Sequence, residues 1–188
     1  MSNRFDPKKL EKLNNPERLK DIPPEYIWRN LELHKVETLV DIGAGTGFFS
    51  LPFLELSGAK KVYACDISEE MINYLGESII PDHPNIIPVR MSTESIPLET
   101  SSADLVFMIT LHHELDNPAK NLLEARRLLK EGGKIFIVDW KKIEMKQGPP
   151  FGIRCRTEDV VKELQGAGFR NISIDESLEK FFLIIGEV

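Results

Sequence analysis

A short apolar run that leads into three alternating glycines constrains the fold of this chain most strongly. Residues 38–42 are rich in strand-forming side chains, and Gly43, Gly45 and Gly47 follow at once. Glycine permits a tight turn and lets a ligand approach the backbone closely. Residues 48–57 then have the character of a helix, so a strand, a turn and a helix are predicted in that order. In open α/β sheets, ligands bind at this carboxyl end of the strands.

Strands and helices alternate along the rest of the chain. Further strands are expected at residues 61–65, 85–90, 103–110 and 134–140, with helices at 68–77, 118–130 and 157–167. The second of these helices is expected to stop at Gly132 and Gly133, because glycine commonly ends helices. Residues 171–175 and 181–186 have no helix between them, so they should pair as an antiparallel hairpin. The order predicts an α/β fold around a mostly parallel sheet.

Length and composition indicate one soluble domain of 188 residues. Residues 1–35 are polar and broken by prolines, so a cap of short helices is expected before an α/β core at 36–188. The net charge of −6 disfavours a nucleic-acid partner, and no segment has the apolar length needed for membrane insertion. Cys65 and Cys155 are too few for a disulfide framework. Without a signal peptide, a cytoplasmic protein is expected.

The spacing of the glycines helps to identify the ligand. A dinucleotide fingerprint needs a third glycine where this chain has Phe48, and its glycines instead alternate. Asp41 stands two residues before Gly43, where a carboxylate suits a cationic ligand better than a pyrophosphate. S-adenosylmethionine carries an ammonium and a sulfonium, so it fits this loop. The alternative is that Asp41 only bonds the backbone of the turn.

Asp66 is the second candidate ligand-binding residue. It ends the second predicted strand, 19 residues after Gly47. A carboxylate at this place can accept hydrogen bonds from both ribose hydroxyls of a nucleoside. Sites for NAD and for S-adenosylmethionine share this feature, so Asp66 does not discriminate between them. Its alternative role is to cap the following helix.

Taken in order, these motifs resemble those of class I S-adenosylmethionine-dependent methyltransferases, nearest the branch of ubiquinone/menaquinone-biosynthesis methyltransferases. The resemblance covers roughly residues 36 to 140. It rests on the glycine loop, Asp66, Ile96-Pro97-Leu98, Leu111-His112-His113, and residues 128–134. It implies a three-layer Rossmann-like fold whose seven-stranded sheet ends in a reversed hairpin. It also implies S-adenosyl-L-methionine as cofactor and S-adenosyl-L-homocysteine as product.

The resemblance carries over to a set of cofactor-binding residues. Adenine contacts are implied around Ser92, Thr93 and Glu94, although the family often has Asp-Ala where this chain has Ser92-Thr93. A serine hydroxyl accepts without the charge assistance of a carboxylate. Ile67 either packs on the adenine or is a plain core residue. The expected cofactor-binding residues are Asp41, Gly43, Ala44, Gly45, Gly47, Asp66, Ile67, Ser92, Thr93, Glu94 and Thr110.

Two neighbouring histidines are the candidate catalytic residues. His112 and His113 follow the fourth strand, where the family places the wall that faces the methyl group. A histidine near its usual pKa can deprotonate an acceptor. Methyl transfer also proceeds by orientation alone, so there is the alternative that one histidine is buried and bonded while the other faces solvent. No second pair of ligands stands at metal spacing, so no metal is expected.

Two segments are candidate lids over the ligand. Residues 140–156 are basic and form a possible substrate loop for an acidic compound, or else a solvated surface loop. The N-terminal segment carries Phe5, Tyr26 and Trp28, whose rings either cover the ligand or simply pack. The sequence therefore predicts a methyltransferase acting on a small molecule. A cofactor-binding regulatory protein without turnover and an NAD-dependent oxidoreductase are the alternatives.

Overall fold

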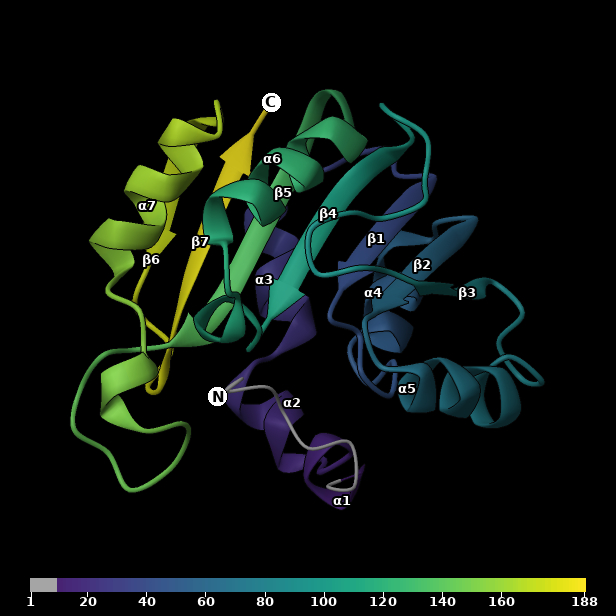
Figure 1. The fold of residues 1–188 in the computed structure, drawn as a ribbon, viewed down its shortest axis with the longest axis horizontal. Coiled ribbons are helices and arrows are strands. Elements are labelled where there is room, and N and C mark those ends of the chain that lie inside the picture. Colours follow the sequence, from purple (N-terminus) through teal and green to yellow (C-terminus); the bar gives the residue numbers. More distant parts are fainter. Residues whose placement is uncertain (1–9) are drawn as a thin grey trace.

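A computed structural model describes residues 10–188 of the chain (Figure 1). Its seven strands form one sheet in the order β3-β2-β1-β4-β5-β7-β6. The first five strands are parallel, and β7 runs antiparallel to both β5 and β6. The predicted α/β fold and the closing hairpin are thereby confirmed. The strands are β1 Thr38–Ile42, β2 Lys61–Asp66, β3 Ile86–Arg90, β4 Ala103–Ile109, β5 Leu129–Trp140, β6 Arg170–Asp175 and β7 Phe181–Glu187.

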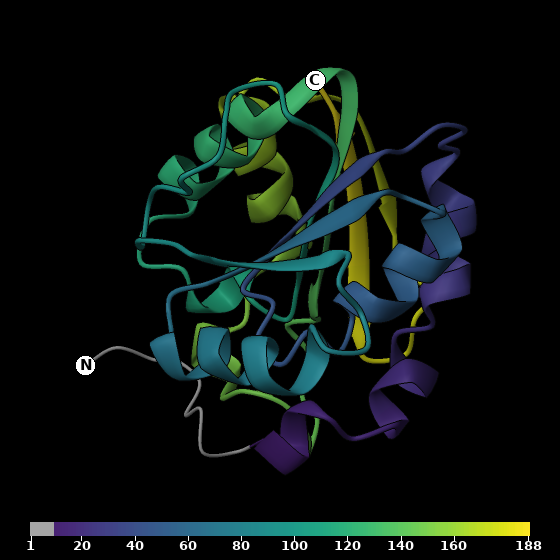
Figure 2. The same ribbon diagram turned by 90° about the vertical axis from the view of Figure 1, so that its right-hand side faces the viewer.

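Helices cover both faces of the sheet and complete three layers (Figure 2). One face packs against α3 and α4 and against α5, which continues as a π-helical turn. The other face packs against α6 and α7. The bounds are α3 Pro24–Leu31, α4 Ser50–Ser57, α5 Glu69–Tyr74, the π-helix Leu75–Ile79, α6 Pro118–Leu128 and α7 Thr157–Gly166.

Aromatic side chains fill the centre of the α3–α4 layer. The ring of Phe107 from β4 stacks on that of Phe136 from β5, with centroids 5.0 Å apart. Phe53 from α4 lies 5.1 Å from both rings. Burying each such side chain contributes about 1.5–3 kcal/mol relative to leaving it in water. Because β1 and β4 are buried on both faces, most of their residues are apolar, and the buried Asp41 of β1 is an exception.

The boundary between α6 and β5 differs from the prediction. The helix ends at Leu128, and Leu129 is already extended with φ −74° and ψ 139°, so the strand begins before Gly132 and Gly133. Leu129 is buried and pairs with Ala103 of β4. Burial of this side chain in the sheet outweighs the helical pattern around it. Gly132, with φ +72°, therefore bends a strand and does not stop a helix.

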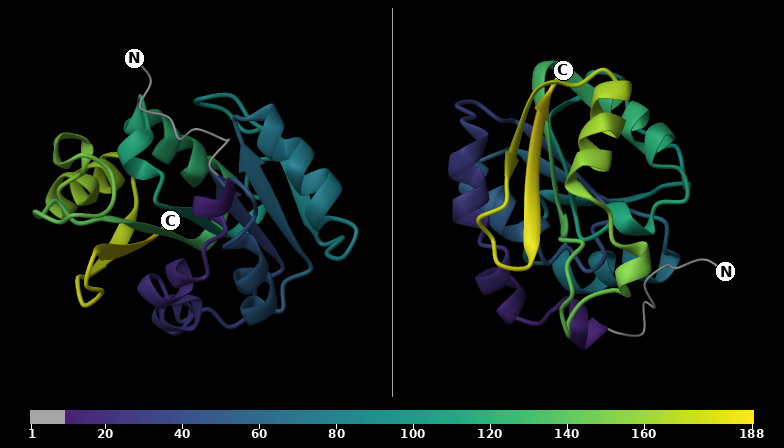
Figure 3. Two further views of the ribbon diagram at one scale, coloured as in Figure 1. Left: turned by 90° about the horizontal axis from the view of Figure 1, so that it is seen from below. Right: turned by 90° about the vertical axis from the view of Figure 1, so that its left-hand side faces the viewer.

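Residues 10–31 lie along the carboxyl edge of the parallel strands and down one face of the sheet (Figure 3). They contain α1 Leu10–Leu13 and α2 Glu17–Asp21, followed by α3. Lys180 donates to both carboxylate oxygens of Asp21, and Lys134 donates to the carbonyl of Leu31 at 2.7 Å. Among residues 10–188, no helix has the length and apolar character needed to cross a membrane.

Candidate ligand and catalytic site

The glycine loop lies between the end of β1 and the start of α4. Gly43, Gly45 and Gly47 all have positive φ, at +72°, +56° and +75°. A Cβ on Gly43 would lie 2.7 Å from the side chain of Leu111, and one on Gly47 would lie 2.8 Å from Leu75. Non-glycine residues rarely adopt this backbone conformation. The loop therefore needs glycine both for its turn and for the close approach of neighbours.

Asp66 holds the glycine loop from the end of the neighbouring strand. Its Oδ2 accepts a hydrogen bond from the Gly45 amide at 2.9 Å, and its Oδ1 accepts from the Ser68 amide at 2.7 Å. Burial raises the pKa of Asp66, against the lowering effect of these two amides. The cap of α5 is Ser68, whose hydroxyl accepts from the Met71 amide. Asp66 thus lies in the first turn before the helix and also supports the loop.

Asp41 is the buried carboxylate at the end of β1. Its Oδ2 accepts a hydrogen bond from the Ser50 hydroxyl at 2.6 Å. Burial raises the pKa of Asp41 to about 7, with Ser50 and Arg18 opposing the rise and Asp66 adding to it. The hydrogen-bond partner of Asp41 is thus a side chain of α4. The alternative that Asp41 only bonds the backbone of the turn does not describe this contact. A carboxyl group with this pKa is ready to ionise beside a cation.

Helix α1 and the turn after it cover the glycine loop. The side chain of Leu13 lies 3.5 Å from where a Cβ on Gly45 would be. The Thr46 hydroxyl donates to Asn14 Oδ1 at 2.6 Å, and Asn14 Nδ2 donates to the Tyr74 hydroxyl at 3.3 Å. Sequence patterns did not single out Leu13 or Asn14, because their contacts are made across more than 30 residues of chain. Leu13 and Asn14 therefore cover the glycine loop at the carboxyl end of β1.

Thr110 follows β4 at the same edge of the sheet and has an unusual backbone. Its φ is +55°, a left-handed conformation that is strained for a β-branched residue. Its amide donates to the carbonyl of Val138 at 2.7 Å, and its hydroxyl accepts from an Arg18 guanidinium nitrogen at 3.3 Å. Strained residues of this kind concentrate at functional sites. Contact of Thr110 with a ligand stays a prediction.

The segment expected to contact adenine, residues 92–94, is exposed. The Ser92 hydroxyl accepts from the Ser95 amide at 3.0 Å and donates to the Ser95 carbonyl, so it closes a local turn. Glu94 pairs with Lys120 of α6 at 2.8 Å. Ile67 is half-buried against the α6–α7 layer. Adenine contacts by Ile67, Ser92, Thr93 and Glu94 stay predictions.

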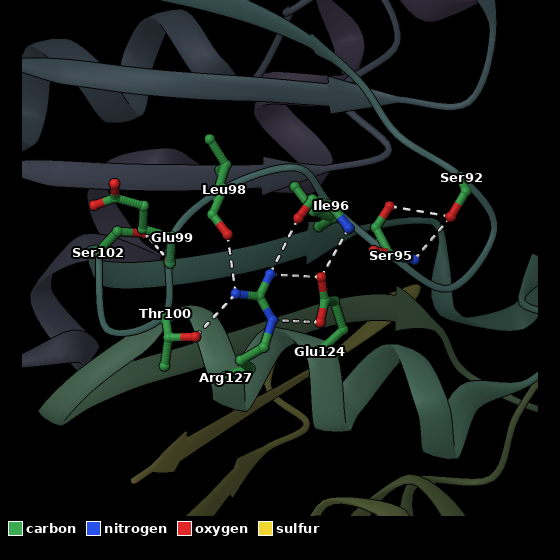
Figure 4. A network of polar contacts seen from close by, with 9 residues as sticks. All are labelled: Ser92, Ser95, Ile96, Leu98, Glu99, Thr100, Ser102, Glu124 and Arg127. Carbon is green, nitrogen blue, oxygen red and sulfur yellow. Dashed lines mark hydrogen bonds and ion pairs between the residues drawn. The ribbon is translucent and has the colours of Figure 1, made fainter.

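A charged network fastens the chain that follows this turn to α6 (Figure 4). Arg127 forms a fork with Glu124, at 2.7 Å for each of two nitrogens. The same guanidinium donates to the carbonyls of Ile96 and Leu98, and Glu124 accepts from the Ile96 amide. The network holds residues 96–98, and with them the loop between β3 and β4, against α6.

The structure separates the two candidate histidines. His113 Nδ1 lies 2.7 Å from Asp139 Oδ1, and its amide donates to Asp139 Oδ2 at 2.9 Å. Asp139 is fully buried near the end of β5. Burial opposes protonation of His113, but Asp139 outweighs it, so the pKa of His113 is raised. Asp139 was not among the predicted site residues, although its place near a strand end is a usable signal.

His112 has a different partner. Its Nε2 lies 2.7 Å from Glu163 Oε2 of α7, and its Nδ1 is buried without a hydrogen-bond partner among residues 10–188. Both histidine side chains are almost fully buried, at 0% and 5% exposed. The alternative of one solvent-facing histidine is therefore wrong, because packing of α7 and β5 encloses both rings. Of the two histidines, only His113 is hydrogen-bonded to a fully buried carboxylate, that of Asp139.

The basic loop at 140–156 is held by hydrogen bonds between its own residues. The buried Arg154 guanidinium donates to the carbonyls of Ile143, Gln147 and Pro149, at 2.6–2.9 Å. Lys142 donates to the Arg154 carbonyl at 2.7 Å. These cations bind backbone oxygens, so they are already engaged before any ligand arrives. A role of this loop as a lid for acidic compounds stays a prediction.

The residues present fit a nucleoside that carries an amino-acid end. The glycine cradle excludes side chains, while Asp66 and Asp41 supply carboxylates near it. Arg18, which the sequence pattern did not single out, adds a cation at the same edge. Among residues 10–188, no three His, Cys, Asp or Glu side chains gather as a metal cluster would. Phe5 lies outside the described residues.

Comparison with known proteins places this geometry in context. The sequence model of a protein family described as a methyltransferase domain matches residues 40–137 of this chain. The crystal structure of a SAM-dependent methyltransferase from Aquifex aeolicus superposes with a TM-score of 0.90. It is 33% identical, and the match covers 98% of this chain and 100% of that one.

Curated relatives agree with the match. An uncharacterized protein of Methanocaldococcus jannaschii, MJ1123, is 30% identical over 75% of this chain and 68% of its own length. The ubiquinone/menaquinone biosynthesis C-methyltransferase UbiE of Acidiphilium cryptum is 29% identical over 60% of this chain. The match covers 46% of UbiE, so this chain resembles about half of that enzyme.

Proposed function

Because the chain belongs to the class I S-adenosylmethionine-dependent methyltransferases, we propose that it methylates a small molecule enclosed beneath its N-terminal cap. This proposal rests on the contacts by which the N-terminal cap covers the glycine loop. Leu13 and Asn14 of the cap contact the loop directly, at Gly45 and Thr46. A polymer would have to displace these contacts, and this favours a small acceptor. S-adenosylmethionine supplies an activated methyl group, and its transfer leaves S-adenosylhomocysteine.

Within this proposal, residues at the ends of β1 and β2 hold the donor. Asp66 accepts the ribose hydroxyls, and Asp41 faces the cationic amino-acid end. Gly43, Ala44, Gly45 and Gly47 give the ligand access to the backbone. The adenine lies toward residues 92–94 and Ile67. Thr110 forms part of the wall that separates the donor from the acceptor.

His113 is proposed as the base that removes a proton from the acceptor. Asp139 Oδ1 accepts a hydrogen bond from the Nδ1–H group of His113, so Nε2 keeps its free electron pair. Glu114 Oε1 lies 3.7 Å from Nε2 and favours the imidazolium that forms when the proton arrives. His112 has no such orientation toward an enclosed acid and is proposed to be structural. His113 and Asp139 thus act as an oriented base and its positioning residue.

The proposal is tested by following the product. The protein is incubated with S-adenosylmethionine and a metabolite extract that has been divided by size, and S-adenosylhomocysteine is measured by mass spectrometry. Product is expected with the small-molecule fraction and should be absent with the protein and nucleic-acid fractions. Donor binding without product in any fraction would instead support a regulatory protein. Turnover only with a macromolecular fraction would contradict the small-molecule proposal.

Donor binding near neutral pH is expected to release protons from Asp41. With a pKa of about 7, this carboxyl is roughly half protonated at pH 7, and an adjacent ammonium favours its charged form. Binding of S-adenosylhomocysteine at pH 7 should therefore release about 0.5 proton. Calorimetric titrations in buffers of different ionisation enthalpy measure this number. Asp41→Asn should abolish the release, and an unchanged release in that variant would assign it to another group.

The same pKa has a consequence for stability without ligand. The folded-state pKa of Asp41 lies above the ordinary value of 3.8, so the folded protein holds this proton more tightly than the unfolded chain. The resulting stability is fully present below pH 3.8 and is lost as the pH rises through about 7. A bound ligand that favours the charged carboxylate of Asp41 offsets this loss of stability. The stabilisation by the ligand should therefore grow as the pH rises through this range.

A further inference from the structure

Arg18 is a half-buried cation that reaches the carboxyl edge of the sheet from α2. Its guanidinium donates to the carbonyl of Leu13 at 2.6 Å and to the Thr110 hydroxyl at 3.3 Å. It also lies over the rings of Phe48 and Phe49, at 5.4 and 4.8 Å from their centroids. The side chain therefore reaches from the cap to Thr110, just after β4, and to the two residues that directly follow the glycine loop.

Within the described part of the chain, the positive charge of Arg18 is incompletely compensated. Among residues 10–188, no carboxylate forms an ion pair with it, and two of its five N–H groups have a recorded acceptor. Burial lowers the pKa of Arg18 to about 10, and Asp41 opposes this only in part. A desolvated cation is costly unless an anion joins it. The position is thus prepared for an anionic group that arrives with a ligand.

The neighbouring charges indicate which anion fits. An amino-acid end is a zwitterion, which needs an anion for its ammonium and a cation for its carboxylate. Asp41 and Arg18 interact electrostatically at this edge and supply these two charges. Guanidinium is the side chain best shaped to bind a carboxylate through two parallel hydrogen bonds. The contacts of Arg18 with Thr110 and Phe48 bracket the glycine loop, which favours the donor over the acceptor as the source of the carboxylate.

We propose that Arg18 binds the carboxylate of the amino-acid end of S-adenosylmethionine and S-adenosylhomocysteine. The cap then closes over the donor by an ion pair that forms only when the donor is bound. This inference rests on the proposed placement of the donor in the glycine loop, and it adds a residue from outside the matched region 40–137. It also couples cap position to donor occupancy.

Binding measurements with truncated ligands test the role of Arg18. Calorimetry compares S-adenosylhomocysteine, its decarboxylated analogue, and methylthioadenosine, which lacks the whole amino-acid end. Arg18→Gln should weaken binding of S-adenosylhomocysteine by about 10–100-fold, because a charge-assisted pair is lost. The same variant should change the affinity for the two ligands without a carboxylate by less than about two-fold. Arg18→Lys should recover part of the loss, since it keeps the charge.

Matched controls separate this role from a structural one. Lys20→Gln removes a cation from the same helix, where Lys20 is exposed and paired with Glu17, and it should leave all three affinities unchanged. If Arg18→Gln weakens all three ligands equally, Arg18 only braces the cap and the proposal is wrong. If Arg18→Gln does not fold, the same comparison with Arg18→Lys decides the question. Wild-type protein that binds none of the ligands would overturn the proposed donor site itself.

Discussion

His113→Gln is expected to lower kcat by about 10²–10⁴-fold, the contribution of a positioned general base. Glutamine keeps a polar side chain of similar length but has no titratable nitrogen. Donor affinity should stay within about two-fold, because the proposed role of His113 concerns the acceptor. Initial rates with the acceptor found by the product assay, together with calorimetric donor binding, measure the two effects separately.

The pH profile gives this prediction a second readout. The pKa of His113 is raised above 6.5, so the rate should increase as pH rises past a midpoint above that value. Asp139→Asn should move the midpoint to lower pH, because it removes the charge that favours the imidazolium. The His113–Asp139 pair contributes stability that is complete below pH 6.5 and is lost as the pH rises through the raised pKa.

His112→Gln serves as the matched control for the base. His112 bonds Glu163 and lies fully enclosed, so its replacement should reduce the thermal midpoint and leave the pH midpoint of the rate unchanged. A wild-type rate and an unchanged pH profile in His113→Gln would show that transfer needs no base at this position. Orientation of the acceptor would then account for catalysis.

Asp66→Ala is expected to weaken S-adenosylhomocysteine binding by about 1–3 kcal/mol, or roughly 5–150-fold in Kd. Two effects combine in this loss. The ribose hydroxyls lose their acceptor, and the Gly45 amide loses the carboxylate that holds the glycine loop. Asp66→Asn keeps one acceptor oxygen and should lie between the wild type and Asp66→Ala. Equilibrium binding on variants with confirmed folding makes the comparison.

Ser68→Ala is the control for the helix-capping role of this turn. It removes the hydroxyl that accepts from the Met71 amide and should cost about 0.5–2 kcal/mol of stability. Donor affinity should stay at the wild-type value, because Ser68 is not proposed to touch the ligand. Wild-type donor affinity in a destabilised Asp66→Ala would assign Asp66 to the helix turn alone.

Local patterns predicted the elements well where periodicity and burial point the same way. The predicted strand at 38–42 agrees with β1 because every one of its residues is buried. The helix expected through Lys130 ends at Leu128, since pairing of Leu129 with Ala103 competes with the local pattern. The glycines that looked like a helix stop instead lie within the strand.

The sequence by itself determined the glycine loop, the order of strands along the chain and the family. These depend on local properties, namely the missing Cβ of glycine, the alternation of apolar segments and the acids at strand ends. Only the tertiary structure decided which histidine bonds a fully buried carboxylate and which cation reaches the carboxyl edge of the parallel strands. His113 meets Asp139 across 26 residues, His112 meets Glu163 across 51, and Arg18 meets Thr110 across 92. Such pairs arise from how helices pack on the sheet, and no local spacing encodes that packing.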